Sequence, residues 1–350
     1  MSGTEELRAR ARAAITTGSF HDNPWLFLLG GTLLAFGSDE LCEQYLPPLL
    51  DGTLGTGCLL YSEPGAGSDL AGLQTRADRD GDHYVVTGQK IWTTGGHEAS
   101  FGLLIARTDW DVPKHPGLSF FVIDMHSAGI DVRPIRQITG ESDFNEVFLN
   151  KVRVPVSARV GDEGQGWKAL QVALAAERSG MGSLAEAGSG GKQKDAGPGL
   201  AAPVADLIER ARSAGRAGDP AIRQELMKIL SWKLTNAWTG QRALAEIRQG
   251  SSSLASLGKL ANSRVLHSSA DLAFRLQGEE SLAYDYDHPT DYPVDRELMW
   301  SFINSIGGGS DQIQRNIISE RVLGLPKGYE PDKGVPFSRV RKGADTRSGN

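Results

Sequence analysis

The chain has 350 residues, enough for two or three domains with a substantial hydrophobic core. Its formal net charge of -6, from 37 basic and 43 acidic side chains, argues against nucleic acid as the main partner, because neutralising phosphates requires a basic face. Cys42 and Cys58 form no CxxC motif or disulfide framework, which indicates a reducing compartment. No apolar run reaches the roughly 20 residues that span a bilayer and no signal peptide opens the chain, so we expect a soluble, cytoplasmic protein without membrane contacts.

The first part of the chain, residues 1–56, is predicted to be helical. Residues 1–17 have the composition of a charged helix, and residues 25–35 form an apolar stretch that contains glycines. Ser38 is followed by two acidic residues, which is the pattern of a helix N-cap with an acidic first turn. We therefore expect a short N-terminal helical domain.

Residues 57–160 are predicted to form a β domain, because the hydrophobic period changes to two. Apolar runs alternate with Gly, Pro and Asp turns, and we expect strands at 102–106, 118–123 and 147–149. The Asp80-Gly81-Asp82 turn between residues 75–79 and 83–87 predicts a hairpin. Several short strands at close spacing are typical of a β-barrel or sandwich.

Residues 161–326 return to helical spacing and are predicted to form a helical bundle. After a linker at 161–166, we expect helices at 167–181, 204–213, 220–249, 254–276, 297–305 and 312–323. Residues 185–203 have the composition of a flexible loop, and residues 327–350 that of a polar, mobile tail. The fold class is therefore α+β, with a helical segment, a central β domain and a C-terminal helical bundle in that order.

Two stretches of the β domain have the composition of a ligand site. Residues 60–69 read Leu-Tyr-Ser-Glu-Pro-Gly-Ala-Gly-Ser-Asp, and residues 88–95 read Gly-Gln-Lys-Ile-Trp-Thr-Thr-Gly. Small residues let backbone amides approach a ligand closely, and Trp92 beside two hydroxyls offers an aromatic face with hydrogen-bonding neighbours. Such a site suits a flat heteroaromatic ring better than a bare phosphate. A Rossmann fingerprint is excluded, because the glycines at 65 and 67 lack a third glycine and a following helix.

These two stretches resemble the flavin-domain signatures of the acyl-CoA dehydrogenase family. Residues 310–318, Ser-Asp-Gln-Ile-Gln-Arg-Asn-Ile-Ile, resemble its C-terminal signature, and the resemblance covers about residues 33–325. It implies FAD as cofactor and an acyl-CoA substrate that is oxidised to the trans-2-enoyl-CoA, a reaction of lipid catabolism. It also implies an electron-transferring flavoprotein as acceptor and a homo- or hetero-oligomer. The chain departs from the family at its start, where most of the usual helices are missing; either the start is truncated or a partner subunit supplies that surface.

The resemblance also assigns residues to the cofactor and the substrate. The cofactor candidates are Leu59, Tyr61, Ser62, Gly67, Ser68, Trp92, Thr93, Thr94, Gln224, Ser310 and Gln312, and the substrate candidates are Ser68 and Arg178. In the family a neighbouring subunit holds the adenine half through two segments. Here Gln224 is a surrogate for the first segment, and Arg275 stands where the second has glutamine. A different subunit could therefore form the adenine site.

The catalytic base is the most informative departure from the family. Many members carry a glutamate just before the C-terminal signature, where this chain has Gly308. Other members carry the base on the first helix after the β domain, in a Leu-x-x-Glu-Arg setting that residues 174–178 match. The preceding segment, 170–176, is apolar nearly all round, and a carboxylate in a buried helix is costly unless it is used or paired. We predict Glu177 as the base and the Gly308 backbone N–H as a donor to the thioester oxygen.

Alternative interpretations stay open from the sequence alone. Glu177 could be a solvated helix residue and Gly308 a plain helix-breaking turn. The chain could be a non-catalytic subunit of a heteromeric acyl-CoA dehydrogenase, or a flavin oxidase of the same fold that passes electrons to oxygen. The seven histidines show no metal-ligand spacing, so no metal is expected.

Overall fold

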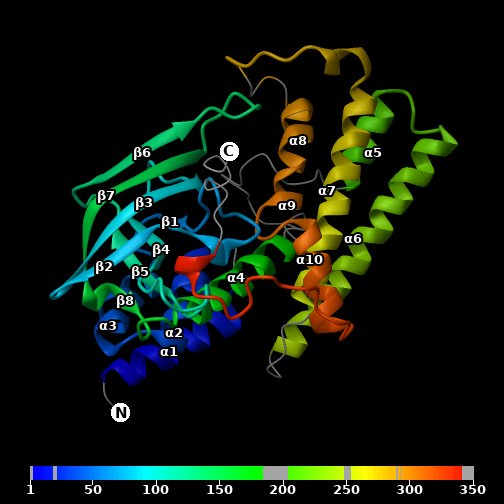
Figure 1. The fold of residues 1–350 in the computed structure, drawn as a ribbon. Coiled ribbons are helices and arrows are strands. Elements are labelled where there is room, and N and C mark those ends of the chain that lie inside the picture. The colour runs from blue at the N-terminus through cyan, green and yellow to red at the C-terminus, as the bar shows by residue number, and fades with distance from the viewer. Residues whose placement is uncertain are drawn as a thin grey trace. The chain divides into compact units, whose positions relative to one another are not determined.

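The computed structural model describes residues 3–18, 22–183, 204–247, 254–288, 291 and 293–340. These residues group into two compact units, whose elements are labelled in Figure 1. Unit 1 lies within Met1–Gln137, Ser142–Ala176 and Gly328–Asn350, and unit 2 lies within Ile138–Glu141 and Glu177–Lys327. The N-terminal helices and the sheet thus share one unit, so the expected boundaries at residues 56 and 160 separate types of secondary structure. The predicted loop at 185–203 lies outside the described residues.

Short helices precede the sheet of unit 1, as the sequence predicts. They are α1 (Gly3–Thr17), the π-helical turn η1 (Leu26–Gly30), α2 (Gly31–Phe36) and α3 (Asp39–Leu50). Ser38 caps α3, because its Oγ accepts a hydrogen bond from the Leu41 N–H at 3.3 Å. Arg8 of α1 donates to the Gly37 carbonyl at 2.8 Å, so α1 is attached to the start of α3.

The described strands form one eight-stranded sheet. They are β1 (Gly57–Leu60), β2 (Arg76–Asp80), β3 (His83–Thr94), β4 (Phe101–Arg107), β5 (Leu118–Asp124), β6 (Ile130–Ile135), β7 (Phe144–Pro155) and β8 (Arg159–Val160). Their order is β6-β7-β3-β2-β4-β5-β8, and β1 pairs in parallel with β4. The Asp-Gly turn joins β2 and β3 as an antiparallel hairpin with Asp80 opposite His83, which confirms the predicted hairpin. Short 3-10 turns follow the strands at η2 (Leu70–Gly72) and η3 (Val156–Ala158).

The central strands β4 and β5 are buried on both faces. Alternate residues, such as Leu103 and Phe120, pack with the N-terminal helices and the start of α4 (Gly166–Ser183). The intervening residues, such as Leu104 and Phe121, pack with side chains of β3 and β7. Because side chains alternate along a strand, one pair of strands can serve two cores only when both faces are covered. The signature-bearing strands β1 and β3 therefore belong to a doubly packed sheet.

Part of the predicted mobile tail at 327–350 is packed, and residues 341–350 lie outside the described residues. Phe337, in the 3-10 turn η7 (Phe337–Arg339), is 2% exposed, and its ring lies over the buried guanidinium of Arg107 with 3.4 Å between Cζ and the ring centroid. The Phe337 N–H also donates to the Val112 carbonyl at 2.8 Å. A buried aromatic ring on a cation attaches the η7 turn to unit 1, a long-range contact that the polar composition of the tail does not reveal.

Unit 2 is helical, as predicted. Its elements are α5 (Val204–Ser213), α6 (Pro220–Ile247), α7 (Ala255–Gln277), the 3-10 turn η4 (Gly278–Leu282), α8 (Pro293–Ser301), α9 (Ile303–Ile306), α10 (Asp311–Ile317) and the π-helical η6 (Ile318–Val322). The unit boundary falls between Ala176 and Glu177, inside α4. Apolar residues at helical spacing on α5, α6 and α7, including Leu207, Leu226 and Leu272, form its core.

Candidate functional site

A buried ion pair joins the two flavin-domain signatures in unit 1. Lys90 of β3 is 0% exposed, and its Nζ lies 2.9 Å from Glu63 Oε1 and 3.0 Å from the Tyr61 carbonyl oxygen. Glu63 also accepts the backbone N–H groups of Gln74 and Thr75 at 2.6 and 2.8 Å. Both carboxylate oxygens are therefore engaged, and the lysine holds the first signature against the second.

Burial and the paired charge act in opposition on the pKa values of Glu63 and Lys90. Burial raises the pKa of Glu63, but the Lys90 ammonium and the hydrogen bonds from residues 74 and 75 outweigh it and hold that pKa below its ordinary value. Burial lowers the pKa of Lys90, and the Glu63 carboxylate opposes that shift. The sequence analysis missed this pair, although both residues lie inside the two signatures.

Trp92 departs from strand geometry in a way that presents its ring. Its φ is 62°, at an irregularity in the β3–β7 pairing that falls between Lys90 and Thr93. A non-glycine residue in this left-handed region costs about 1–3 kcal/mol, and such residues cluster at functional sites. The indole is 58% exposed and meets Phe144 edge to face, with 6.1 Å between ring centroids. The bulge therefore interrupts the strand where an aromatic face is exposed.

The hydroxyls beside the indole have contrasting environments. Thr93 is 1% exposed, and its Oγ1 has no hydrogen-bond partner among the described residues, whereas Thr94 is exposed. The Asn145 side-chain amide donates to the Thr93 carbonyl at 2.9 Å and fixes the local backbone. A buried hydroxyl without a partner costs about 1–3 kcal/mol, which a polar ligand atom can offset. The exposed indole and this hydroxyl fit a flat heteroaromatic ring with polar edges, such as the isoalloxazine of FAD.

The other cofactor candidates of unit 1 lie on β1 and the loop that follows. They are Leu59 and Ser62, which are half-buried, Tyr61, which is buried, and Gly67 and Ser68, which are exposed. The Ile91 N–H donates to the Ser62 carbonyl at 3.0 Å, so the end of the first signature lies beside the residue that precedes Trp92. The structure thus brings Ser62 close to the second signature and leaves Gly67 and Ser68 on an exposed turn.

In unit 2, the predicted oxyanion position is a rigidly held glycine turn. Gly308 and Gly309 have φ values of 61° and 85°, which side chains other than glycine rarely adopt. The buried Gln314 donates through Nε2 to the Gly308 carbonyl at 2.9 Å and to the Gly309 carbonyl at 3.2 Å. Ser310 then caps α10, because its Oγ accepts the Ile313 N–H at 3.4 Å.

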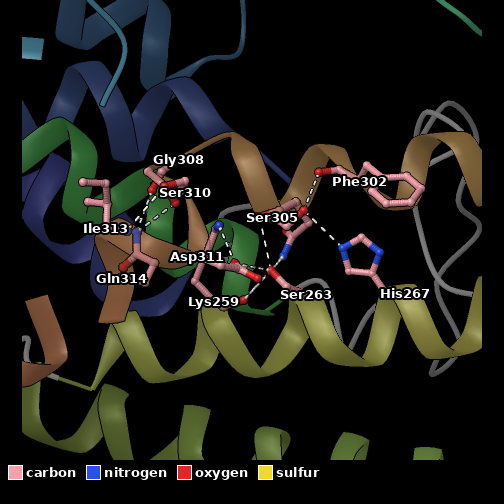
Figure 2. Close-up of polar contacts among 12 residues, drawn as sticks. Lys259, Ser263, His267, Phe302, Ser305, Gly308, Ser310, Asp311, Ile313 and Gln314 are labelled. Atoms are coloured by element: carbon pink, nitrogen blue, oxygen red, sulfur yellow. Dashed lines mark hydrogen bonds and ion pairs between the residues drawn. The ribbon is translucent and has the colours of Figure 1, made fainter. Parts of the chain in front are cut away.

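A buried lysine lies in the same unit, in the polar cluster drawn in Figure 2. Lys259 of α7 is 0% exposed, and its Nζ lies 3.2 Å from Asp311 Oδ1, which also accepts the Ser263 hydroxyl at 2.8 Å. Burial lowers the pKa of Lys259, and the negative charges of Asp311 and Glu177 oppose that shift. The half-buried Glu177 is therefore within electrostatic reach of Lys259. The sequence analysis did not identify Lys259 or Asp311.

The remaining candidates do not join this cluster in the described residues. The side chain of Arg178 lies outside the described part of the chain, and Gln224 and Gln312 are exposed on α6 and α10. At the second adenine segment, Arg275 makes ion pairs with Glu225 and with Asp271, the latter at 2.9 Å. Carboxylates of unit 2 thus already engage the guanidinium that replaces the family's glutamine.

Neither a metal site nor a membrane-spanning helix occurs among the described residues. No group of three His, Cys, Asp or Glu residues is placed to hold a metal ion. No helix in the same residues combines the length and hydropathy needed to cross a membrane.

Comparison with protein families gives two matches that together span most of the chain. Residues 58–152 match the family model of the acyl-CoA dehydrogenase middle domain. Residues 196–323 match the model of the acyl-CoA dehydrogenase C-terminal domain. The two matched regions contain both flavin-domain signatures and the glycine turn.

Proteins similar to this chain are named as dehydrogenases of acyl-CoA or of a related CoA thioester. Acyl-CoA dehydrogenase IpdE1 of Mycobacterium tuberculosis is 36% identical over 330 residues, which cover 92% of this chain and 79% of that protein. Cyclohexane-1-carbonyl-CoA dehydrogenase of Geobacter metallireducens is 31% identical, over 83% of this chain and 74% of that protein. Among solved structures, the Tcur3481-Tcur3483 steroid ACAD has a TM-score of 0.74 at 25% identity, covering 87% of this chain and 76% of that chain. The ChsE4-ChsE5 complex from Mycobacterium tuberculosis has a TM-score of 0.67 at 28% identity, covering 92% and 82%.

Proposed function

Because the chain belongs to the acyl-CoA dehydrogenase family, we propose that it oxidises an acyl-CoA thioester to the trans-2-enoyl-CoA. In this reaction the α-carbon loses a proton, the β-carbon loses a hydride, and a double bond forms between them. FAD, when bound, supplies the acceptor for the hydride. The observation that carries the proposal is a half-buried carboxylate, Glu177, in the same unit as a glycine turn that lacks the usual acid.

In the proposed mechanism, Glu177 takes the α-proton on its carboxylate. Lys259 is buried in the same unit, and the negative charge of Glu177 is one of those that oppose the lowering of its pKa by burial. The Gly308 N–H donates to the thioester oxygen, where negative charge develops as the proton leaves. Gln314 supports this role, because its hydrogen bond to the Gly308 carbonyl fixes the orientation of the turn.

In unit 1, the same proposal assigns the flavin ring to the exposed face of Trp92. The Thr93 hydroxyl, which has no partner among the described residues, would form a hydrogen bond with the polar edge of the ring. The closed pair of Glu63 and Lys90 keeps both signatures in register but does not contact the reacting atoms in this scheme. Leu59, Tyr61, Ser62, Gly67, Ser68 and Thr94 of unit 1, and Ser310 and Gln312 of unit 2, remain proposed contacts of the cofactor or the acyl-CoA.

The proposal is tested by replacing the base. Glu177→Gln keeps the size of the side chain and removes its basicity, so anaerobic flavin bleaching by an accepted acyl-CoA should slow by about 10²–10⁴-fold. Glu209→Gln is the matched control, because Glu209 is an exposed helical glutamate of the same unit that pairs with Arg212. Equal bleaching rates in wild type and Glu177→Gln would rule out Glu177 as the base. The acyl-CoAs tested should range from short-chain to steroid-derived ones, since one similar solved structure is that of a steroid ACAD.

We also propose that the chain works as an oligomer. The long helix α6 exposes Met227, Leu234 and Trp238 at helical spacing, and such an apolar stripe favours burial against another chain. Leu234→Lys should lower the molar mass found by light scattering without loss of helical circular dichroism. An unchanged mass in that variant would exclude this stripe from the interface.

A second candidate function is that of a non-catalytic subunit in a heteromer, with the ion pairs of Arg275 at the adenine segment as the favouring observation. The purified chain would then bind FAD only after co-expression with a paralogous subunit, and it would not bleach alone. A flavin oxidase is distinguished by oxygen consumption with the same acyl-CoA. Rapid reduction of an added electron-transferring flavoprotein would support the dehydrogenase instead.

A further inference from the structure

A buried arginine in unit 1 has no role in the proposed reaction. Arg107 of β4 is 0% exposed, and its guanidinium donates to the carbonyls of Ala71 at 2.7 Å and Leu73 at 3.2 Å. A third hydrogen bond, at 3.1 Å, reaches the Lys114 carbonyl, and no carboxylate in the described part of the chain accepts one. A buried cation is costly unless other groups compensate its charge. The neighbours of Arg107 must therefore provide that compensation.

Two of these carbonyls belong to residues 70–75, the segment that directly follows the first flavin-domain signature. The Arg107 backbone N–H also donates to the Thr75 carbonyl at 2.8 Å, and the Glu63 carboxylate accepts two N–H groups of the same segment. The segment is thus held through both its carbonyls and its N–H groups. Because the exposed turn at 67–68 leads directly into this segment, Arg107 limits where that turn can lie.

The third carbonyl connects a second loop to the same signature. It belongs to Lys114, between β4 and β5, whose Nζ lies 2.8 Å from Oδ1 of Asp69, the last residue of the signature. An exposed pair of this kind contributes little by itself. The buried hydrogen bonds of the guanidinium therefore carry the attachment between the two loops.

An aromatic ring from the far end of the described chain covers the charge of Arg107. The centroid of the buried Phe337 ring lies 3.4 Å from the guanidinium Cζ. Backbone hydrogen bonds fix the ring, because the Phe337 N–H donates to the Val112 carbonyl at 2.8 Å and the Ser338 N–H to the Trp110 carbonyl at 2.7 Å. Burial lowers the pKa of Arg107 to about 10, which leaves it charged at neutral pH and able to form a cation–π interaction.

We propose that Arg107 and Phe337 are positioning residues for the cofactor: the ring holds the guanidinium, and the guanidinium holds residues 70–75 and the adjoining turn at Gly67 and Ser68 that contacts FAD. The inference rests on the proposed function, because it requires this turn to be a cofactor contact. It gives a part in FAD binding to Phe337, which lies outside both regions that match the family models.

The first test is titration of the full-length apoprotein with FAD. Arg107→Lys keeps the positive charge but replaces the planar fork of donors by one ammonium, so the Kd should rise by about tenfold. Phe337→Leu keeps an apolar side chain and removes the π face, so the Kd should rise by about three- to tenfold. Phe337→Tyr retains the ring face and should bind FAD as wild type does.

The matched control is Phe121→Leu, the same change at another fully buried ring of unit 1. Phe121 packs edge to face on Tyr84, with 5.1 Å between ring centroids, in a core that contains no residue of the segment 70–75. This variant should lose stability without losing affinity for FAD. An equal loss of affinity in the control would overturn the inference, because reduced stability would then account for the effect.

A second readout does not require FAD. Amide hydrogen exchange of residues 70–75 in the apoprotein should become faster in Arg107→Lys and Phe337→Leu, because the segment loses the group that fixes its carbonyls. It should stay at the wild-type rate in Phe337→Tyr and in the control. If Arg107→Lys does not fold, Phe337→Leu and its control decide the question.

The outcomes separate the inference from the proposed function. If the wild type binds no FAD, alone or with a paralogous subunit, the proposed function fails, and the inference fails with it. If the wild type binds FAD and bleaches with an acyl-CoA, but Arg107→Lys and Phe337→Leu bind FAD equally well, the proposed function stands and the inference is overturned. Faster exchange with an unchanged Kd would likewise assign both residues a structural role only.

Discussion

Each unit buries a lysine beside a carboxylate, and the two pairs differ in what else touches them. In unit 1, Glu63 receives Lys90 and two backbone N–H groups, and its charge also acts on the buried guanidinium of Arg107. In unit 2, Asp311 receives Lys259 and a serine hydroxyl, and a second carboxylate, Glu177, acts on the same lysine. The pair in unit 1 joins the two flavin-domain signatures, whereas the pair in unit 2 joins α7 to the start of α10. Burial of a lysine therefore does not by itself reveal its role.

The largest expected effect comes from removing the charge of Glu63 in its ion pair with Lys90. Glu63→Gln leaves the Lys90 ammonium buried without a counter-charge, so the free energy of unfolding should fall by about 3–5 kcal/mol. Urea unfolding followed by circular dichroism measures it, with Asp131→Asn in the exposed pair with Arg133 as the control that should change little. A loss as small as that of the control would mean that the pair in unit 1 is not structural.

Acid titration should produce a related loss in the wild type. The folded-state pKa of Glu63 lies below its ordinary value of 4.5, so its contribution to stability is complete above about pH 4.5 and is lost as the pH falls through the folded pKa. The urea midpoint of wild type should therefore fall more steeply than that of Glu63→Gln between about pH 5 and pH 3. Parallel curves for the two proteins would contradict the assignment.

A smaller effect is expected at the glycine turn that precedes Asp311. Gly308→Ala places a Cβ at a φ of 61° and should reduce stability by about 1–2 kcal/mol. Gly307→Ala is the matched control, because Gly307 has an ordinary φ of -68° and should tolerate the methyl group. Thermal melting of the two variants measures the difference. Equal melting temperatures would show that the turn relaxes and does not hold Gly308 rigidly.

The smallest expected effect concerns the exposed indole of Trp92. Trp92→Ala should weaken FAD binding by about 0.5–1.5 kcal/mol, a two- to tenfold change, and leave the fold intact. Titration of the apoprotein with FAD, beside far-ultraviolet circular dichroism, measures both. Tyr329→Ala, at another exposed aromatic residue of unit 1, should leave FAD binding unchanged. Unaltered FAD affinity in Trp92→Ala would count against the placement of the flavin.

Local features of the fold follow from the sequence, whereas most of the site chemistry does not. The Asp-Gly hairpin and the Ser38 cap were predictable because their signals lie within a few residues of one another. The packing of Phe337 on Arg107, inside the predicted tail, was not foreseen because it joins residues far apart in the chain. The resemblance located Trp92, but no residue pattern predicted its left-handed backbone.

The two lysine pairs illustrate the same limit. Glu63 and Lys90 are 27 positions apart and Lys259 and Asp311 are 52 apart, so each pairing depends on tertiary structure. One signal for the second pair was available. Polar side chains at 259, 263 and 267 follow helical spacing on a helix whose other faces are largely apolar, which indicates a buried polar stripe.

The left-handed backbone of Gly308 also bears on how a family can move its catalytic base from one helix to another. A glutamate introduced at this position would begin from a φ of 61°, a conformation that costs a residue with a Cβ about 1–2 kcal/mol. A single substitution to glutamate therefore restores the acid but not the backbone conformation that would direct its carboxylate to the substrate. Gln314 still holds the turn in its present form. An acid at position 308 therefore costs stability unless a second substitution relaxes the turn. The turn thus favours retention of the glycine in a chain for which we propose Glu177 as the base.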